Sequence, residues 1–275
     1  MVYKYNHSLS LTRMTYVLVS CYLYIKRLLY IYKMLSVLTA NGKSLNIKSD
    51  EDIIYHFSDN KNCGRIILRQ INTDRMYDVY LKDKTDLVIL DIGANIGLFT
   101  LYASDSAKRI VSVEPTPSHQ ELFKKITQDL DNVELVQAAL ADRDETIHFY
   151  TSVTNTTQNS IVNTGAVKGG DMFEVQGYCF DTLLDKYNLD HVDFCKIDIE
   201  GSEMVAITVE QMKKVYDRID KMFIEVHSTT RESNIRWEDD LIDNRKKIEN
   251  ILHESGYKTK VMPGYYQDVL YVYKD

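Results

Sequence analysis

Residues 87–97 read Leu-Val-Ile-Leu-Asp-Ile-Gly-Ala-Asn-Ile-Gly, a short apolar run followed by a turn that contains two glycines. The run Leu87–Asp91 predicts a β-strand, and Gly93 and Gly97 permit a tight turn into a helix. An asparagine stands where the dinucleotide fingerprint G-x-G-x-x-G has its second glycine, so the loop is not built to hold a pyrophosphate. It suits instead a ligand with a cationic amino-acid end, which Asp91 would face.

An apolar run followed by an amphipathic segment recurs along the rest of the chain. We expect further strands at Arg109–Glu114, Val133–Ala138, Val192–Ile197 and Ile219–Val226. We expect helices that begin near Gly97 and Gly201, and others over Ser118–Leu130, with Ser118 and Glu121 as a capping box, and over Asp239–Ser255. Repeated strand–helix units predict an α/β protein whose mainly parallel sheet carries helices on both faces.

Two further strand pairs are expected at the ends of this region. Tyr257–Met262 and Val269–Tyr273 predict a closing antiparallel pair. Arg65–Ile71 and Met76–Leu81 predict a hairpin around Asn72-Thr73-Asp74. The chain is thereby divided into a leader, residues 1–49, an extension with the hairpin, residues 50–85, and a main domain, residues 86–275.

The composition limits the class of protein. The 275 residues include 33 Lys and Arg against 40 Asp and Glu, and the net charge of −7 argues against a general nucleic-acid binder. Hydrophobic residues make up 44%, which is typical of a globular protein. The four cysteines form no C-x-x-C pair, so neither a zinc site nor a disulfide framework is expected, and a reducing, cytoplasmic environment is indicated.

The leader differs sharply from the rest of the chain. Residues 1–49 hold seven Lys and Arg, no Asp or Glu, and seven of the 20 tyrosines, so the leader carries +7 and the remaining residues −14. Its longest uncharged run, Met14–Ile25, is shorter than the ~20 apolar residues of a spanning helix. Lys26-Arg27 follow this run, where a signal peptide would have a small-residue cleavage site.

Three interpretations of the leader remain open. A helix over residues 14–38 has a narrow basic stripe that includes Lys26 and Lys33, and it would lie peripherally on an anionic membrane surface. The same helix would equally cover part of the core or pack on a partner. The third interpretation is that Met14 or Met34 is the true start.

Candidate cofactor contacts lie at the carboxyl ends of the strands, where open α/β sheets bind their ligands. Glu114 ends the second strand, and an acid at this place accepts hydrogen bonds from ribose hydroxyls. A ribose and a cationic amino-acid end together describe S-adenosylmethionine. The small residues Ala139 and Ala141 leave room for an adenine ring. Asp142 either accepts from the adenine amino group or is a turn residue.

Candidate catalytic residues follow the fourth and fifth strands. Asp198 and Glu200 come at the end of one strand and Glu203 soon after, and carboxylates are costly to gather without a use. His227 ends the next strand, where it either forms a general-base pair with Asp198 or is a surface histidine. Asp198, Glu200 and His227 are also possible metal ligands. We expect no metal at these residues.

These motifs, in this order, resemble the FkbM family of methyltransferases between about residues 64 and 273. The segments that carry the resemblance are residues 90–97, Val113-Glu114-Pro115, residues 139–142, residues 196–203 (Lys-Ile-Asp-Ile-Glu-Gly-Ser-Glu) and Ile224-Glu225-Val226-His227. The resemblance implies a Rossmann-like class I methyltransferase fold with seven strands and S-adenosyl-L-methionine as the cofactor. It implies cofactor contacts at Asp91, Gly93, Asn95, Gly97, Glu114 and Asp142, and substrate-side, catalytic roles for Asp198, Glu200 and His227.

The resemblance also implies a reaction, because family members typically O-methylate hydroxyls of sugars or secondary metabolites. We therefore expect O-methylation of a sugar, glycan or glycolipid by a cytoplasmic enzyme, membrane-associated if the leader binds lipid. A small secondary metabolite is an alternative acceptor. RNA ribose is another, since Lys196, Asp198 and Glu225 form a Lys/Asp/Glu set, but the acidic main domain argues against it. A non-catalytic binding module is the remaining alternative.

Overall fold

The protein is described by a computed structural model that covers residues 67, 69–71, 74–150, 172–229, 236–262 and 267–275. All of these residues belong to the second of two compact units, Lys61–Asp275. The leader and its three interpretations lie outside the described residues. In the described part of the chain, no helix is long and apolar enough to cross a membrane.

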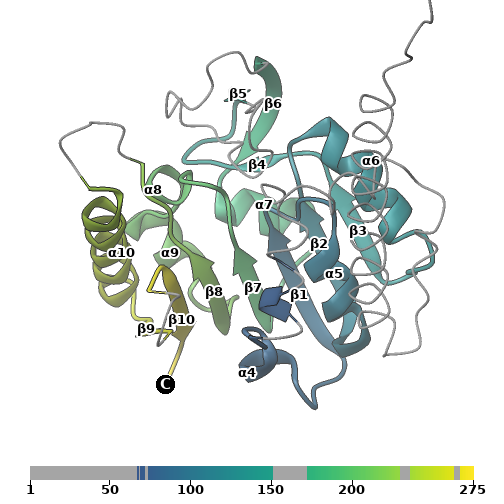
Figure 1. Ribbon diagram of the computed structural model, residues 1–275, viewed down its shortest axis with the longest axis horizontal. Coiled ribbons are helices and arrows are strands. Elements are labelled where there is room, and N and C mark those ends of the chain that lie inside the picture. The colour runs from purple at the N-terminus through teal and green to yellow at the C-terminus, as the bar shows by residue number, and fades with distance from the viewer. Residues whose placement is uncertain (1–66, 68, 72–73, 151–171, 230–235, 263–266) are drawn as a thin grey trace, which may run out of the picture. The chain divides into compact units, whose positions relative to one another are not determined.

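A seven-stranded sheet forms the centre of this unit (Figure 1). Its strands, in spatial order, are β3 (Val133–Val136), β2 (Ala107–Val113), β1 (Leu87–Ile92), β7 (Phe194–Ile197), β8 (Lys221–Glu225), β10 (Val269–Tyr273) and β9 (Lys258–Val261). The pairs from β3 to β8 are parallel, and β10 runs antiparallel to both β8 and β9. The expected mainly parallel sheet with an antiparallel C-terminal strand is confirmed.

Helices cover the two faces of the sheet, as expected from the strand–helix alternation. They are α4 (Asp78–Leu81), α5 (Leu98–Ala103), η3 (Ser104–Ser106), α6 (Pro117–Ile126), α7 (Phe180–Lys186), α8 (Glu203–Ala206), α9 (Val209–Val215) and α10 (Trp237–Glu254). In Figure 1, α10 flanks the β8–β10 side of the sheet and α6 flanks the β3 side.

The core on one face is aliphatic and the core on the other is aromatic. Alternate strand residues such as Leu90 and Ile224 pack with residues of α7, α9 and α10. On the opposite face the ring of Tyr77 lies 4.7 Å from the rings of both Phe99 and Phe223. Successive strand side chains point to opposite faces, so Asp91, Lys196 and Glu225 share the aromatic face.

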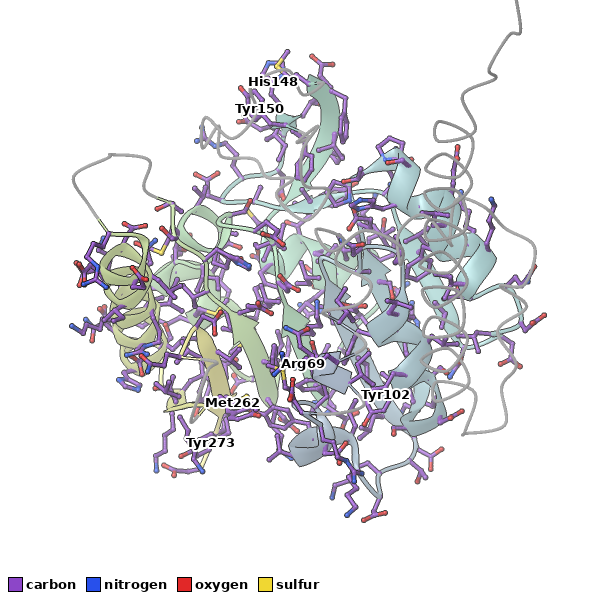
Figure 2. The ribbon with its side chains drawn as sticks, in the orientation of Figure 1. Arg69, Tyr102, His148, Tyr150, Met262 and Tyr273 are labelled. Atoms are coloured by element: carbon purple, nitrogen blue, oxygen red, sulfur yellow. The ribbon has the colours of Figure 1, made fainter. Side chains whose placement is uncertain are left out.

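A second, three-stranded sheet lies at the top of the view in Figure 1 and was not anticipated. It consists of β4 (Ala139–Leu140), β6 (Met172–Tyr178) and β5 (Thr146–Tyr150), in that spatial order. Figure 2 shows His148 and Tyr150 on β5, where they flank the buried Phe149. Phe149 packs with Ala139 and Val175 in a small separate core.

The predicted hairpin before the main domain is wrong. The described residues between 65 and 71 are helical, and residues 78–81 form the helix α4. Tyr77, Tyr80 and Leu81 are buried, and their i, i+3, i+4 spacing belongs to a helix rather than a strand. The Tyr80 hydroxyl donates to the carbonyl oxygen of Met222 at 3.1 Å, which ties this segment to the sheet.

The predicted capping box is also wrong. Helix α6 begins at Pro117, with Thr116 as the N-cap residue, so Ser118 already lies inside the first turn. Proline at the first helical position has a suitable fixed φ and gives up an N–H that would have no helical partner. The proline was therefore the better sign of the helix start.

Candidate active site

The loop after β1 has glycines because its backbone lies against two neighbours. Gly93 has φ +81°, and a Cβ there would lie 1.8 Å from the carbonyl oxygen of Asp198. Gly97 has φ +89°, and its Cβ would lie 2.7 Å from the ring of Phe123. Any side chain at Gly93 would thus push apart the ends of β1 and β7, which form the floor of the site.

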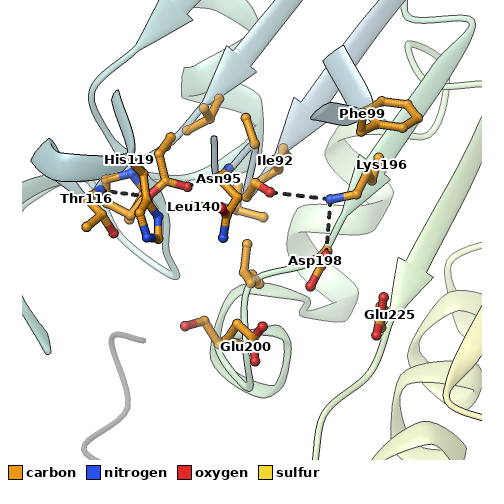
Figure 3. A pocket seen from close by; sticks show the side chains of 18 of the residues that line it. Ile92, Asn95, Phe99, Thr116, His119, Leu140, Lys196, Asp198, Glu200 and Glu225 are labelled. Carbon is orange, nitrogen blue, oxygen red and sulfur yellow. Dashed lines mark hydrogen bonds and ion pairs between the residues drawn. The ribbon is translucent and has the colours of Figure 1, made fainter. Parts of the chain in front are cut away.

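A pocket of about 270 Å³ opens at the carboxyl ends of the parallel strands (Figure 3). The lining residues that bear on its chemistry are Gly93, Asn95, Glu114, His119, Ala138, Ala139, Phe149, Lys196, Asp198, Glu200, Glu225 and His227. Figure 3 shows Thr116 and His119 on one side of the pocket and Lys196, Asp198 and Glu225 on the other. The pocket therefore has two chemically distinct sides.

Glu114 defines the first side and is only 4% exposed. Its carboxylate accepts from the backbone N–H groups of Asn95 and Thr116, each at 2.8 Å, and lies 3.3 Å from His119 Nδ1. Burial raises the pKa of Glu114, but the hydrogen bonds from His119 and Thr116 outweigh it and hold the pKa below its usual value. Glu114 is thus an ionised acceptor in the pocket wall.

Lys196 defines the second side and is 4% exposed. Its Nζ lies 3.2 Å from Asp198 Oδ2, 3.3 Å from the carbonyl oxygen of Gly93 and 3.7 Å from Asp91 Oδ1. Burial lowers the pKa of Lys196, but Asp198, Asp91 and Glu225 outweigh it and raise the pKa above its usual value. The buried ammonium therefore stays charged and joins the loop after β1 to Asp198.

Asp91 lies directly behind the loop after β1 and is fully buried. Its Oδ2 accepts from the Thr100 hydroxyl at 2.6 Å, while Oδ1 has no hydrogen-bond partner. Burial raises the pKa of Asp91, against the effects of Lys196 and Thr100. Asp91 acts on the pocket only through Lys196 and the loop, because its own side chain is not part of the lining.

On the Lys196 side of the pocket, three carboxylates surround His227. Nδ1 lies 3.0 Å from Glu203 Oε1, and Nε2 lies 3.5 Å from Glu200 Oε2 and 3.8 Å from Asp198 Oδ1. Glu203 is fully buried and also accepts from the backbone N–H groups of Ile199 and Gly201. Burial lowers the pKa of His227, but Glu200 and Glu203 outweigh it and raise the pKa well above its usual value.

The structure brings most of the sequence-predicted residues together. Those that line the pocket are Gly93, Asn95, Glu114, Asp198, Glu200 and His227. Gly97 caps α5 instead, and Asp91 lies behind the loop. Asp142 is outside the pocket, exposed, with its carboxylate 3.2 Å from Arg143 Nε.

His119 and Phe149 were not named from the sequence, and Lys196 and Glu203 were named there without a role in the expected reaction. Lys196 and Glu203 lie within the Lys-Ile-Asp-Ile-Glu-Gly-Ser-Glu segment, and the strand period could have placed Lys196 beside Asp91. His119 lies more than one helical turn beyond Glu114. The sequence pattern does not indicate that it faces the pocket, because the direction of its side chain depends on where α6 starts. Phe149 comes from the unanticipated second sheet.

Comparison with known proteins gives the family. The sequence profile of the Methyltransferase FkbM domain matches residues 91–259, a range that runs from Asp91 at the end of β1 to Thr259 in β9. The chain belongs to the FkbM methyltransferase family. It is therefore a methyltransferase, and the matched range includes every catalytic and cofactor-binding residue named from the sequence.

Individual relatives of this FkbM methyltransferase match different lengths of the chain. Methyltransferase 1 of Beauveria bassiana is 30% identical over 182 residues, which cover 58% of this chain and 72% of that protein. The AMB antimetabolite synthetase AmbE of Pseudomonas aeruginosa is 35% identical over 100 residues, which cover 33% of this chain but only 5% of AmbE. A crystal structure of Methyltransferase FkbM from Methylobacillus flagellatus superposes with a TM-score of 0.45 and 17% identity, over 70% of this chain and 45% of that one.

Proposed function

We propose that this methyltransferase uses S-adenosyl-L-methionine to O-methylate a hydroxyl of a sugar, glycan or glycolipid. The proposal has two parts, a cofactor side at Glu114 and an acceptor side at Asp198. The observation that carries it is that one pocket has an ionised acceptor, Glu114, on one side and three carboxylates, Asp198, Glu200 and Glu225, on the other. Each part is supported by a separate set of contacts.

The cofactor side fits a nucleoside with an amino-acid tail. The Glu114 carboxylate lines the pocket and is oriented by two backbone N–H groups, which suits it to accept hydrogen bonds from ribose hydroxyls. Ala138 and Ala139 line the wall beyond Glu114 and leave space for a flat base. The loop after β1 lines the pocket at Gly93 and Asn95, where the amino-acid end would lie. When bound, S-adenosylmethionine supplies an electrophilic methyl group.

The acceptor side fits an uncharged hydroxyl compound. Carboxyl groups exchange hydrogen bonds with hydroxyl groups, so the cluster Asp198, Glu200 and Glu225 suits a sugar. Burial raises the pKa of both Glu200 and Glu225 to about 8, so these two are mainly neutral near pH 7 and can donate as well as accept. Among the described residues that line the pocket, Lys196 is the one lysine, and its charge is already paired with Asp198 and Asp91. We assign Asp198 as the group that takes the proton of the hydroxyl, because Lys196 fixes one of its oxygens. His227, held by Glu203, keeps the other oxygen in place.

The experiment is a methyl-transfer assay with labelled S-adenosylmethionine and fractionated glycans, lipids and small metabolites, paired with a cofactor-binding measurement. In the variant Asp198→Asn we expect turnover to fall by about 10²–10⁴-fold while cofactor affinity stays within a few fold. Label in an RNA fraction, or in small metabolites alone, would replace the proposed acceptor. Absence of any thermal shift with S-adenosylmethionine would instead support a non-catalytic module.

A further inference from the structure

The turn between β7 and α8 places two carboxylates beside the histidine that follows β8. Strand β7 ends at Ile197, so Asp198 and Glu200 are not part of the strand. Both residues lie in the following turn, where Glu200 has φ +54°. Their carboxylates consequently point toward the same place as the imidazole of His227, which follows the neighbouring strand β8.

We propose that Asp198, Glu200 and His227 bind a divalent metal ion at the acceptor side of the pocket. One oxygen of each carboxylate and one imidazole nitrogen lie within 4.8 Å of one another. Ligands that share an ion at roughly 2.0–2.6 Å from it lie up to roughly 4–5 Å apart, so the three side chains need only small movements. All three residues line the pocket, so the remaining coordination positions are open to a substrate.

The histidine is oriented as metal-binding histidines are. Its Nδ1 is hydrogen-bonded to Glu203 Oε1 at 3.0 Å, and this leaves Nε2 directed at Glu200 and Asp198. A carboxylate on the far nitrogen fixes the tautomer and the ring plane of a ligating histidine. Glu203 is itself fully buried and is held by two backbone N–H groups, so the orientation is rigid.

Charge also favours a cation at this place. Acidic side chains outnumber cationic ones here: Asp198, Glu200 and Glu203 surround His227. Lys196 is shared between Asp198 and Asp91. Two carboxylate oxygens with one imidazole nitrogen form a mixed ligand set, which suits Mn²⁺ or a similar divalent ion better than Ca²⁺.

The role of the ion in the reaction rests on the proposed function, but the test of metal binding does not. An ion in this position would bind the acceptor hydroxyl and lower its pKa, so that the Asp198 oxygen beside Lys196 would suffice as the weak base that takes the proton. The oxygen of Asp198 that faces His227 would bind the ion, while the other oxygen stays with Lys196.

The test is a titration of the full chain with Mn²⁺, followed by electron paramagnetic resonance, without cofactor or acceptor. We expect one site that is lost in Glu200→Gln and in His227→Gln, and an affinity about 10–100-fold weaker in Glu203→Gln. A thermal shift with S-adenosylmethionine in each variant shows that it is folded. The matched control is Asp220→Asn, in the second His/Asp cluster of the described residues, His191, Asp193 and Asp220.

The outcomes separate the two proposals. Binding that persists in both Glu200→Gln and His227→Gln, or that is lost only in Asp220→Asn, overturns the metal site. Methyl transfer at an undiminished rate after complete chelation overturns a role for the ion in the reaction. Mn²⁺ binding at this site without any methyl transfer from S-adenosylmethionine leaves the metal site standing and overturns the proposed function.

Discussion

Asp91 and Lys196 face each other across the parallel strands β1 and β7, with Oδ1 and Nζ 3.7 Å apart in the buried core. Lys196 contacts Asp198 as well, at 3.2 Å, so one ammonium group is shared between a structural carboxylate and a candidate catalytic one. A buried ion pair is weak evidence of stabilisation, but removing one partner leaves an uncompensated charge. The pair therefore couples the stability of the core to the geometry of the site.

The first prediction concerns Lys196→Met. We expect a loss of about 3–5 kcal/mol in the free energy of unfolding, because Asp91 and Asp198 lose their shared cation. Urea unfolding at neutral pH measures it. The matched control is Lys258→Met, since Lys258 is exposed and its ion pair in the described part of the chain is with Asp275, and its loss should be much smaller. Equal losses of unfolding free energy in the two variants would show that the buried pair contributes no more to stability than the exposed pair.

The second prediction concerns Gly93→Ala. The new Cβ would meet the carbonyl oxygen of Asp198, which is backbone and cannot turn away, so the loop after β1 must shift. We expect loss of the thermal shift with S-adenosylmethionine together with destabilisation. The control Gly256→Ala has a similar positive φ, +97°, but its Cβ would meet only the Tyr216 ring, at 3.0 Å. Gly256→Ala should lower the free energy of unfolding by about 1–2 kcal/mol and leave cofactor binding intact. A normal thermal shift with S-adenosylmethionine in Gly93→Ala would contradict the close packing of the loop after β1.

The strand–helix order, the seven-stranded sheet and its antiparallel closing pair could be predicted because each strand is a short apolar run with a clear end. The same logic placed Gly93, Asn95, Glu114, Asp198, Glu200 and His227 at one edge of the sheet, where the pocket lies. What the pattern predicts is the position of a residue along an element.

The direction of a side chain at a turn depends on local backbone angles, which the sequence pattern does not give. Strand alternation would place Asp198 and Glu200, which are two residues apart, on one face, but both lie in the turn after β7, where alternation does not apply. Asp91, at the end of a buried strand, was assigned to the ligand although its side chain turns into the core toward Thr100. The helix α4 was missed because Met76–Leu81 was assigned as a strand, although the i, i+3, i+4 spacing of Tyr77, Tyr80 and Leu81 fits a helix.

The third prediction is a pH dependence caused by Glu114. Its pKa in the folded protein is lower than its usual value, so its contribution to stability is complete above the unfolded pKa, about 4.3. That contribution is lost as the pH falls through the folded pKa. The difference in unfolding free energy between the wild type and Glu114→Gln should thus shrink as the pH is lowered from about 6 to below about 4.

The control for Glu114 is Glu134→Gln, because Glu134 is half-exposed and pairs with Arg109 at the surface. Its difference from the wild type should be small throughout the pH range. Cofactor affinity gives a second measurement, since Glu114→Gln replaces a charged acceptor of hydroxyl hydrogen bonds and should weaken binding about tenfold or more. A difference in stability that grows on acidification would contradict the assignment of a low pKa.

The last prediction concerns Asp142, which the family resemblance assigns to the cofactor. Its carboxylate is at the surface beside Arg143, outside the pocket lining. We expect Asp142→Asn to bind S-adenosylmethionine with unchanged affinity, measured by calorimetry beside Glu114→Gln as the positive control. A tenfold loss in Asp142→Asn would mean that this turn moves to the adenine when the cofactor binds, and would restore the assignment made from the sequence.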